Sequence, residues 1–323
     1  MYNEELKTRF INSYTNSSQR RYNCLILFNK LQEYEEKWQA DVCTWGEEEL
    51  EPVIDKILGL RLKGSESRLV ALKTYAKWCL ENNFPNAKDS LINLKYSGIR
   101  KMRQEMVRDP SQLQDYLNII FYPESRNTMD NVFRCFYWFA YSGCSEGDVM
   151  SITADDIDLQ SKIIRIKKES LIEEYPIYEE SIPALESCIT STSFVYIHPN
   201  YSKDIDRDRV GGNQLLRGIK TETTLSRARI EISRRSKKAV DKKETDLHLS
   251  YFRVWLSGVF YRTYELEKIG VEPNFMELAG RFMSGKNYKL DSGRNTIEAK
   301  QRAVAKEYLD DYYRWKLAFM SEL

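Results

Sequence analysis

Basic side chains gather in one segment of the 323-residue chain, where they could bind phosphate groups. Residues 203–243 contain thirteen lysines and arginines against six acidic residues, whereas residues 145–180 contain ten acidic and four basic residues. The whole chain has 49 basic and 48 acidic residues, a formal net charge of +1. Bulk charge therefore does not indicate a nucleic-acid-binding protein, but a neutral chain with this partition can present one basic face to a polyanion.

The cysteines and histidines do not form a metal-binding pattern. The six cysteines contain no C-x-x-C pair, and the only histidines are His198 and His248. Several cysteines fall on apolar helical stripes, where a thiol behaves as a small hydrophobic group. We therefore expect no metal site and no cofactor.

The most basic part of the chain is typical of a helix, from about 223 to 240. Apolar residues recur there at helical spacing and would pack inward, namely Leu225, Ala228, Ile232 and Ala239. Basic residues cover the other faces, among them Arg227, Arg229, Arg234, Arg235, Lys237 and Lys238. Two interpretations are open: a solvated helix face, or a surface that contacts DNA phosphates.

The remaining elements that would position this helix are also mostly helical. A helix begins near Ser17 or Ser18, with Arg20 and Arg21 in its first turn. Further helices are expected over residues 48–60, 66–81, 111–121, 127–142, 248–267, 273–284 and 295–318. Strands over 157–168 and 172–177 would form a hairpin with Glu169 and Ser170 near its turn, and 202–222 should be a loop.

The pattern predicts two domains. A compact helical domain covers residues 1–95, a highly charged linker 96–112, and a larger domain 113–323. The chain contains no run of about 18 apolar residues, so no membrane span is predicted. Its first residues lack the apolar core of a signal peptide. We therefore expect a soluble, cytoplasmic protein.

One stretch carries a family motif. Residues 136–164, FYWFAYSGCSEGDVMSITADDIDLQSKII, resemble the tyrosine recombinases, the phage integrase family. In that family an apolar helix precedes T-G-L-R, then x-x-E-L, then D-I-D and a strand. Here Ser142-Gly143 stands at the T-G step, Asp148-Val149 at E-L, and Asp155 to Asp158 at the D-I-D step. The resemblance covers roughly residues 10–318.

The catalytic positions of the family are mostly lost. The first catalytic arginine falls on Ser145. The family's H-x-L-R motif falls on residues 250–253, SYFR, which keeps Arg253 and loses the histidine. The later L-G-H motif falls on residues 278–281, LAGR, so a second histidine is missing. The hairpin lysine has two candidates, Lys167 and Lys168, and the nucleophile has three, Tyr308, Tyr312 and Tyr313.

The resemblance implies a mainly α fold: an N-terminal SAM-like helical core-binding domain, followed by an integrase-like catalytic-type domain with a small β-sheet. With one arginine and both histidines gone, we expect no strand cleavage. Retained phosphate binding would suit a sequence-specific repressor of a prophage that maintains lysogeny, as in the integrase-fold repressors of SPβ-type prophages. The alternatives are a divergent active recombinase, and an interaction module that no longer binds DNA.

The expected partner is double-stranded operator DNA. The residues expected to contact it are Arg20, Arg21, Lys167, Lys168, Arg227, Arg234, Arg235, Lys237, Lys238 and Arg253. The apolar C-terminal segment after Trp315 would pack either in cis or on a second copy, which would form a homodimer on DNA. An antirepressor protein is a further candidate partner, and no membrane partner is expected.

Overall fold

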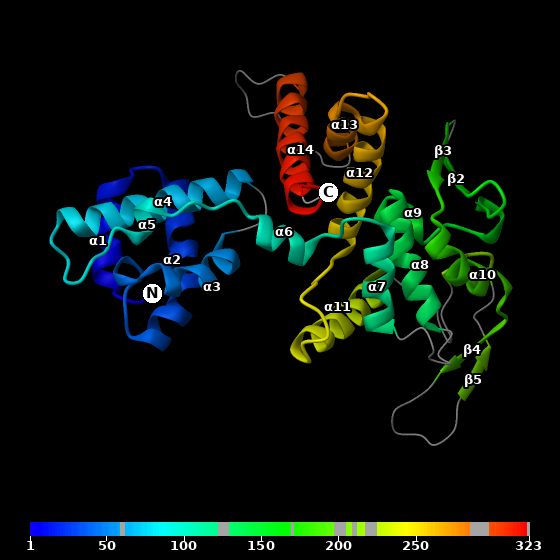
Figure 1. The fold of residues 1–323 in the computed structure, drawn as a ribbon, viewed down its shortest axis with the longest axis horizontal. Helices are drawn as coiled ribbons and strands as arrows, with labels where there is room; N and C mark the ends of the chain where they lie inside the picture. The colour runs from blue at the N-terminus through cyan, green and yellow to red at the C-terminus, as the bar shows by residue number, and fades with distance from the viewer. Residues whose placement is uncertain are drawn as a thin grey trace. The chain divides into compact units, whose positions relative to one another are not determined.

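The computed structural model is mainly helical (Figure 1) and describes residues 1–58, 62–121, 129–168, 171–196, 205–208, 212–216, 225–284 and 297–321. It divides into two compact units. The first unit comprises Met1–Met102 and Asn274–Ala318, and the second comprises Arg103–Pro273 and Phe319–Leu323. The first unit therefore includes a segment that the sequence assigns to the C-terminal domain. Within the described residues, no helix has the length and apolar character that a membrane span requires.

Most of the first unit is built from helices of the N-terminal hundred residues. These are α1 (Glu4–Tyr14), α2 (Ser18–Trp38), η1 (Val42–Thr44), α3 (Glu47–Ile57), α4 (Leu62–Glu81) and α5 (Ser90–Asn93). Their core is aromatic: the ring of Phe10 lies 6.1 Å from that of Phe28 and 5.1 Å from that of Tyr75. Ser17 begins α2 as its N-cap, as predicted, because its hydroxyl accepts a hydrogen bond from the backbone of Arg20.

Two C-terminal helices complete the first unit, α13 (Met276–Ser284) and α14 (Ile297–Phe319, of which residues to 318 belong to this unit). Arg314 of α14 donates two hydrogen bonds to the carbonyl of Ser97, from Nε at 2.9 Å and from Nη2 at 2.8 Å. Gly98 has φ +70°, and a Cβ there would lie 2.0 Å from the Arg314 guanidinium. Only glycine therefore allows this approach without strain.

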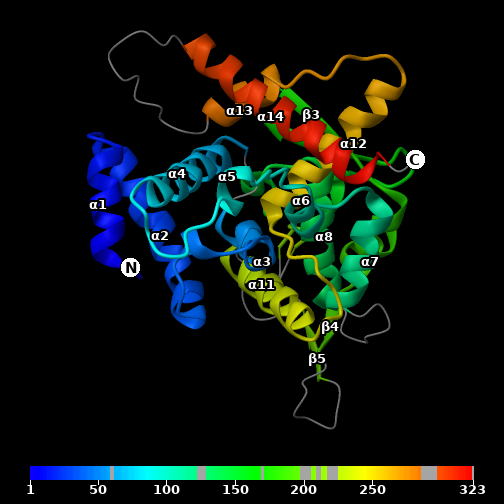
Figure 2. The same ribbon diagram turned by 60° about the vertical axis from the view of Figure 1, so that its left-hand side comes forward.

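The second unit packs helices around α8. Its elements are α7 (Pro110–Phe121), α8 (Met129–Ser142), α9 (Glu146–Val149), η2 (Ala154–Asp156), β1 (Ile157–Asp158), β2 (Ile163–Lys168), β3 (Leu171–Pro176), η3 (Glu179–Ser181), α10 (Ile182–Thr190), β4 (Ser193–Tyr196), β5 (Ile205–Asp208), α11 (Leu225–Asp241) and α12 (Tyr251–Lys268). Nearly every α8 side chain is buried, and α12 lies directly against it. In Figure 2, α11 lies beside α7.

The predicted helices are confirmed with boundaries shifted by a few residues, and α6 (Ile99–Glu105) lies within the segment predicted as a linker. The expected hairpin forms as β2–β3, antiparallel, with Lys168 opposite Leu171. Its turn residues Glu169 and Ser170 lie outside the described residues. Lys162, with φ +55°, separates β1 from β2, which the sequence predicts as one strand. The prediction of a loop over 202–222 is wrong at β5, which pairs with β4.

A buried ionic network holds α1 in the first unit. The Lys7 ammonium contacts both oxygens of Glu35 at 2.5 Å and Oδ2 of Asp41 at 3.6 Å, and the three side chains are at most 1% exposed. The Tyr75 hydroxyl donates to Asp41 at 3.0 Å, and the backbone of Val42 donates to Glu35. One cation therefore lies between two acidic side chains away from water, where an unpaired charge is costly.

This network predicts a pH dependence of local stability. Burial raises the pKa of Glu35 from 4.5 to about 7, although Lys7 favours the ionised carboxylate. Between these two values the folded chain binds a proton that the unfolded chain has released, so stability is highest below pH 4.5 and falls as the pH rises through about 7. Hydrogen exchange of α1 and α2, corrected for intrinsic rates, should show a smaller opening free energy at pH 7.5 than at pH 5.5. Equal opening free energies would contradict this protonation.

Candidate nucleic-acid interface

Helix α11 presents two exposed lysines, and its buried side is the predicted one. Ala228, Ile232 and Ala239 are at most 4% exposed. Lys237 and Lys238 are exposed, and among the described residues neither has an acidic partner. Arg227 also lies on this helix, but its side chain is outside the described part of the chain. Free lysines on a helix surface can neutralise phosphates without giving up another contact.

The two neighbouring arginines of α11 are already engaged within the second unit. Arg234 pairs with Glu231 at 2.7 Å. Arg235 is 19% exposed and pairs with Asp130 at 2.9 Å and with Glu231 at 2.7 Å. Its guanidinium also lies 5.1 Å from the ring centre of Phe121. Arg235 therefore stabilises the packing of α11, and its removal would take one cation away from the buried Asp130.

The hairpin places its two candidate lysines differently. Lys167 is exposed, with no acidic partner among the described residues. Lys168 pairs with Asp148 at 2.8 Å and with Glu173 at 2.7 Å. Burial acts to lower the pKa of Lys168, but the hydrogen bonds to these two carboxylates outweigh it and raise the pKa. Lys168 is therefore a cation neutralised by two anions of its own chain.

Ser145, which stands at the position of the first catalytic arginine, belongs to the same cluster. Its hydroxyl is the N-cap of α9 and donates to Oδ2 of Asp148 at 2.6 Å. Ser145 and Lys168 are thus brought together through Asp148. A neutral hydroxyl and an acidic residue therefore stand where the family has a cationic donor. We call Ser145, Asp148, Lys168 and Glu173 together the Asp148 cluster.

The second motif arginine is half-buried and paired. Arg253 lies in the first turn of α12, where Nε is 3.2 Å from Glu105 and the guanidinium lies 5.8 Å from the ring centre of Phe252. Ser250, at the motif's histidine position, is the N-cap of α12 and accepts a hydrogen bond from the backbone of Arg253 at 3.3 Å. His248 is directed elsewhere: its Nδ1 lies 3.2 Å from the Ser236 hydroxyl.

Two of the three candidate tyrosines are packing residues. Tyr308 and Tyr312 are 3% and 0% exposed, and the Tyr312 ring stacks on Trp315 at 6.2 Å. Tyr313 is 45% exposed. A buried phenol in an aromatic cluster is poorly placed to attack a phosphodiester. Of the three candidates, Tyr313 has the most accessible side chain.

The N-terminal candidates lie in the first turn of α2. Arg20 has an exposed side chain. Arg21 is half-buried, and its Nε donates to the carbonyl of Thr15 at 2.9 Å. Arg20 therefore remains available to a phosphate, whereas Arg21 holds the turn between α1 and α2.

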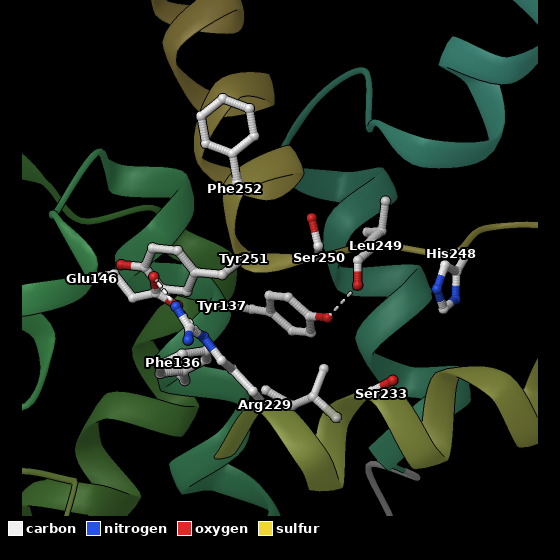
Figure 3. Close-up of a pocket in the computed structure, with 11 residues that line it drawn as sticks. Phe136, Tyr137, Glu146, Arg229, Ser233, His248, Leu249, Ser250, Tyr251 and Phe252 are labelled. Carbon is white, nitrogen blue, oxygen red and sulfur yellow. Dashed lines mark hydrogen bonds and ion pairs between the residues drawn. The ribbon is translucent and has the colours of Figure 1, made fainter. Parts of the chain in front are cut away.

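A pocket of about 310 Å³ lies in the second unit between α8, α9, α11 and the start of α12 (Figure 3). Arg229 of α11 forms an ion pair with Glu146 of α9 at this pocket. The pocket also contains Ser250 and His248, which stand at and near an altered motif position of the family. The sequence predicts Arg229 on the basic surface but indicates neither its pairing with Glu146 nor the pocket, because no local pattern relates residues 83 positions apart.

Comparison with known proteins agrees with the N-terminal prediction. Residues 1–81 match the family model of the MrpR N-terminal core-binding domain. This match agrees with the prediction of a helical core-binding domain at the N-terminus. No curated protein matches the chain.

Two solved structures are similar over most of their length. One is the Tn1549 transposon integrase in complex with circular intermediate DNA, with 14% identity, a TM-score of 0.35, and coverage of 93% of this chain and 98% of that one. The other is the XerA recombinase, with 16% identity, a TM-score of 0.35, and coverage of 83% and 86%.

Proposed function

We propose that this chain is a sequence-specific transcriptional repressor of a prophage that maintains lysogeny and acts in the cytoplasm, on prophage DNA, without cleaving it. The observation that carries the proposal is the Asp148 cluster. Where the resemblance leads one to expect a free arginine and a free lysine, Ser145 is neutral and Lys168 is bound by two carboxylates.

This cluster argues against phosphodiester cleavage. In the family reaction a tyrosine attacks phosphorus, and cationic donors stabilise the charge that develops on the non-bridging oxygens. Removing one such donor costs about 10²–10³ in rate. Here one arginine and two histidines are absent, Lys168 is neutralised, and Tyr308 and Tyr312 are buried. Phosphate binding makes weaker demands, because an exposed lysine needs no reactive geometry to release counterions from DNA.

The proposed DNA-binding role of α11 is testable. Replacing Lys237 and Lys238 together by Ala should weaken binding to all DNA sequences, and should flatten the plot of log affinity against log salt by about 0.9 for each phosphate that is no longer neutralised. Fluorescence anisotropy over a salt series measures both quantities. Lys268→Ala removes an exposed lysine paired with Glu265 at the far end of α12 and serves as the control. An unchanged salt slope in the double variant would remove α11 from the interface.

One experiment distinguishes a repressor that does not cleave DNA from an active recombinase. The purified protein is mixed with fragmented host and prophage DNA, bound fragments are sequenced, and the mixtures are examined for covalent protein–DNA adducts. Enrichment of a few promoter-proximal elements without adducts supports a repressor. Adducts that disappear in Tyr313→Phe would instead establish an active recombinase.

Restoring the missing catalytic arginine alone should not restore DNA cleavage. Ser145→Arg is expected to yield no adduct, because both motif histidines remain absent and Asp148 would pair with the new guanidinium. Tyr313→Phe should leave repression in a promoter reporter unchanged.

A homodimer on repeated operator elements and control by an antirepressor complete the proposal. Sedimentation of the protein with one-site and two-site DNA would test the dimer.

A further inference from the structure

The pocket at Arg229 has the chemistry of a small-molecule site. We propose that it binds a small carboxylate with an aromatic body, and that this ligand weakens DNA binding. Binding of the ligand stands on the pocket alone, whereas its effect on DNA rests on the proposed function. The volume of about 310 Å³ is at the lower end of the range for small-molecule sites.

Arg229 can bind a second carboxylate while keeping its first. Its Nε and Nη2 face Glu146. A guanidinium has five N–H donors, and among the described residues the Nη1 edge of Arg229 has no hydrogen-bond acceptor. The side chain is 54% exposed, so a ligand can reach this edge. Figure 3 shows the guanidinium beside the Glu146 carboxylate, among the side chains that line the pocket.

The other polar groups of the pocket also favour an acceptor-rich ligand. The Tyr116 hydroxyl donates to Ser236 at 2.8 Å, which leaves the Ser236 proton for Nδ1 of His248. With Nδ1 as the acceptor of that proton, Nε2 of His248 is the ring's donor. Ser250 already accepts a hydrogen bond from the backbone of Arg253, so its hydroxyl proton is available. These groups lie at the N-terminus of the 18-residue helix α12, whose dipole favours an anion.

The remaining lining is aromatic and apolar. Phe136 and Tyr251 lie with ring centres 4.7 Å apart, and Phe252 stacks on Trp255 at 5.7 Å. Tyr137 is fixed by its hydrogen bond to the carbonyl of Leu249 at 2.7 Å. The rings of Tyr251 and Phe252 are partly exposed and offer flat surfaces to an aromatic body, whereas Phe136 and Tyr137 are buried and support the pocket wall. An inorganic anion would leave this part of the pocket unfilled.

Occupancy of the pocket can be transmitted to the proposed DNA surface through α11. Arg229, Ile232 and Ser233 form the pocket wall on this helix, and Lys237 and Lys238 follow one turn later. The Arg229–Glu146 ion pair ties α11 to α9. A bound carboxylate adds negative charge beside this helix, so it should reduce the attraction of α11 for phosphates.

The test measures ligand binding first and DNA binding second. Isothermal titration calorimetry of the full chain compares 3-phenylpropionate with its neutral amide and with inorganic phosphate. We expect the acid to bind at least tenfold more tightly than either. Arg229→Met should weaken the acid about tenfold, and Ser233→Trp, which fills the pocket from an exposed position, should abolish binding. Arg302→Met, which removes an exposed arginine paired with Glu298, is the matched control.

The outcomes separate the two claims. Equal binding of acid, amide and phosphate, or acid binding that survives Ser233→Trp, would overturn the pocket assignment. If the acid binds as expected, anisotropy with operator DNA should show weaker DNA binding in the wild type and no effect in Ser233→Trp. An unchanged DNA affinity would overturn the regulatory part alone. Failure of DNA binding without any acid would count against the proposed function, not against the pocket.

Discussion

Lys7→Met is expected to destabilise the first unit by about 3–5 kcal/mol, because it leaves Glu35 and Asp41 buried without a cation. Methionine keeps most of the side-chain length, so the loss is electrostatic and not a cavity. Hydrogen exchange should show early opening of α1 and α2 while the exchange of α8 is unchanged. The defect should be smaller at pH 5.5 than at pH 7.5, since Glu35 can then be protonated.

Lys77→Met is the control for this substitution. Lys77 is 68% exposed and pairs with Glu81 across one turn of α4. Exposed pairs of this kind contribute about 0.3–0.5 kcal/mol. If the two variants were destabilised to a similar extent, the buried network would not be what holds α1 in place.

Gly258→Ala should prevent the native packing of the second unit. A Cβ at Gly258 of α12 would lie 1.9 Å from the carbonyl oxygen of Tyr141 and 2.9 Å from its Cα, so α8 and α12 would have to separate. Backbone atoms cannot move aside as a flexible side chain can, and overpacking costs about 1–3 kcal/mol even where side chains adjust. We expect a lower urea midpoint and loss of soluble protein.

Gly147→Ala is the matched substitution. Gly147 lies in α9, and the nearest atom to its added Cβ is the Ser145 hydroxyl oxygen at 3.8 Å, an ordinary contact. Alanine is the better helix former by about 0.5–1 kcal/mol, so this variant should be as stable as the wild type or slightly more stable. A normal urea midpoint in Gly258→Ala would show that α8 and α12 are not in close contact.

Helical periodicity predicted most of the long helices, because burial of one face imposes that period on the sequence, but α1 and α10 were not predicted. The same periodicity also bears on Lys7, which falls on the stripe formed with Phe10 and Ile11, both buried. Lys7 was not predicted as a buried residue, because helix α1 itself was not predicted. Its partners could not be predicted, since Glu35 and Asp41 are brought to it only by the packing of α1 on α2. Strand β5, IDRD, was missed because its polar residues lack apolar alternation.

The same spacing distinguishes the basic residues of α11. Arg235 follows Ile232 by three positions and precedes Ala239 by four, so it lies at the edge of the buried stripe, whereas Lys237 and Lys238 lie off it. What sequence could not provide were the pairings across elements: Lys168 with Asp148 and Glu173, and Arg229 with Glu146. These pairings decide which cations remain available to a polyanion.

The division of the first unit has a consequence for synthesis of the chain. Ser97 and Arg314, which bind each other, are 217 residues apart. At about 5–20 residues per second, a ribosome makes the second of them about 10–40 seconds after the first. Throughout that interval the whole of residues 103–273 has emerged or is emerging, with time to fold around α8. Residues 103–273, nearly all of the second unit, can therefore fold before α13 and α14 exist. The first unit, whose synthesis began earlier, acquires its last two helices only afterwards.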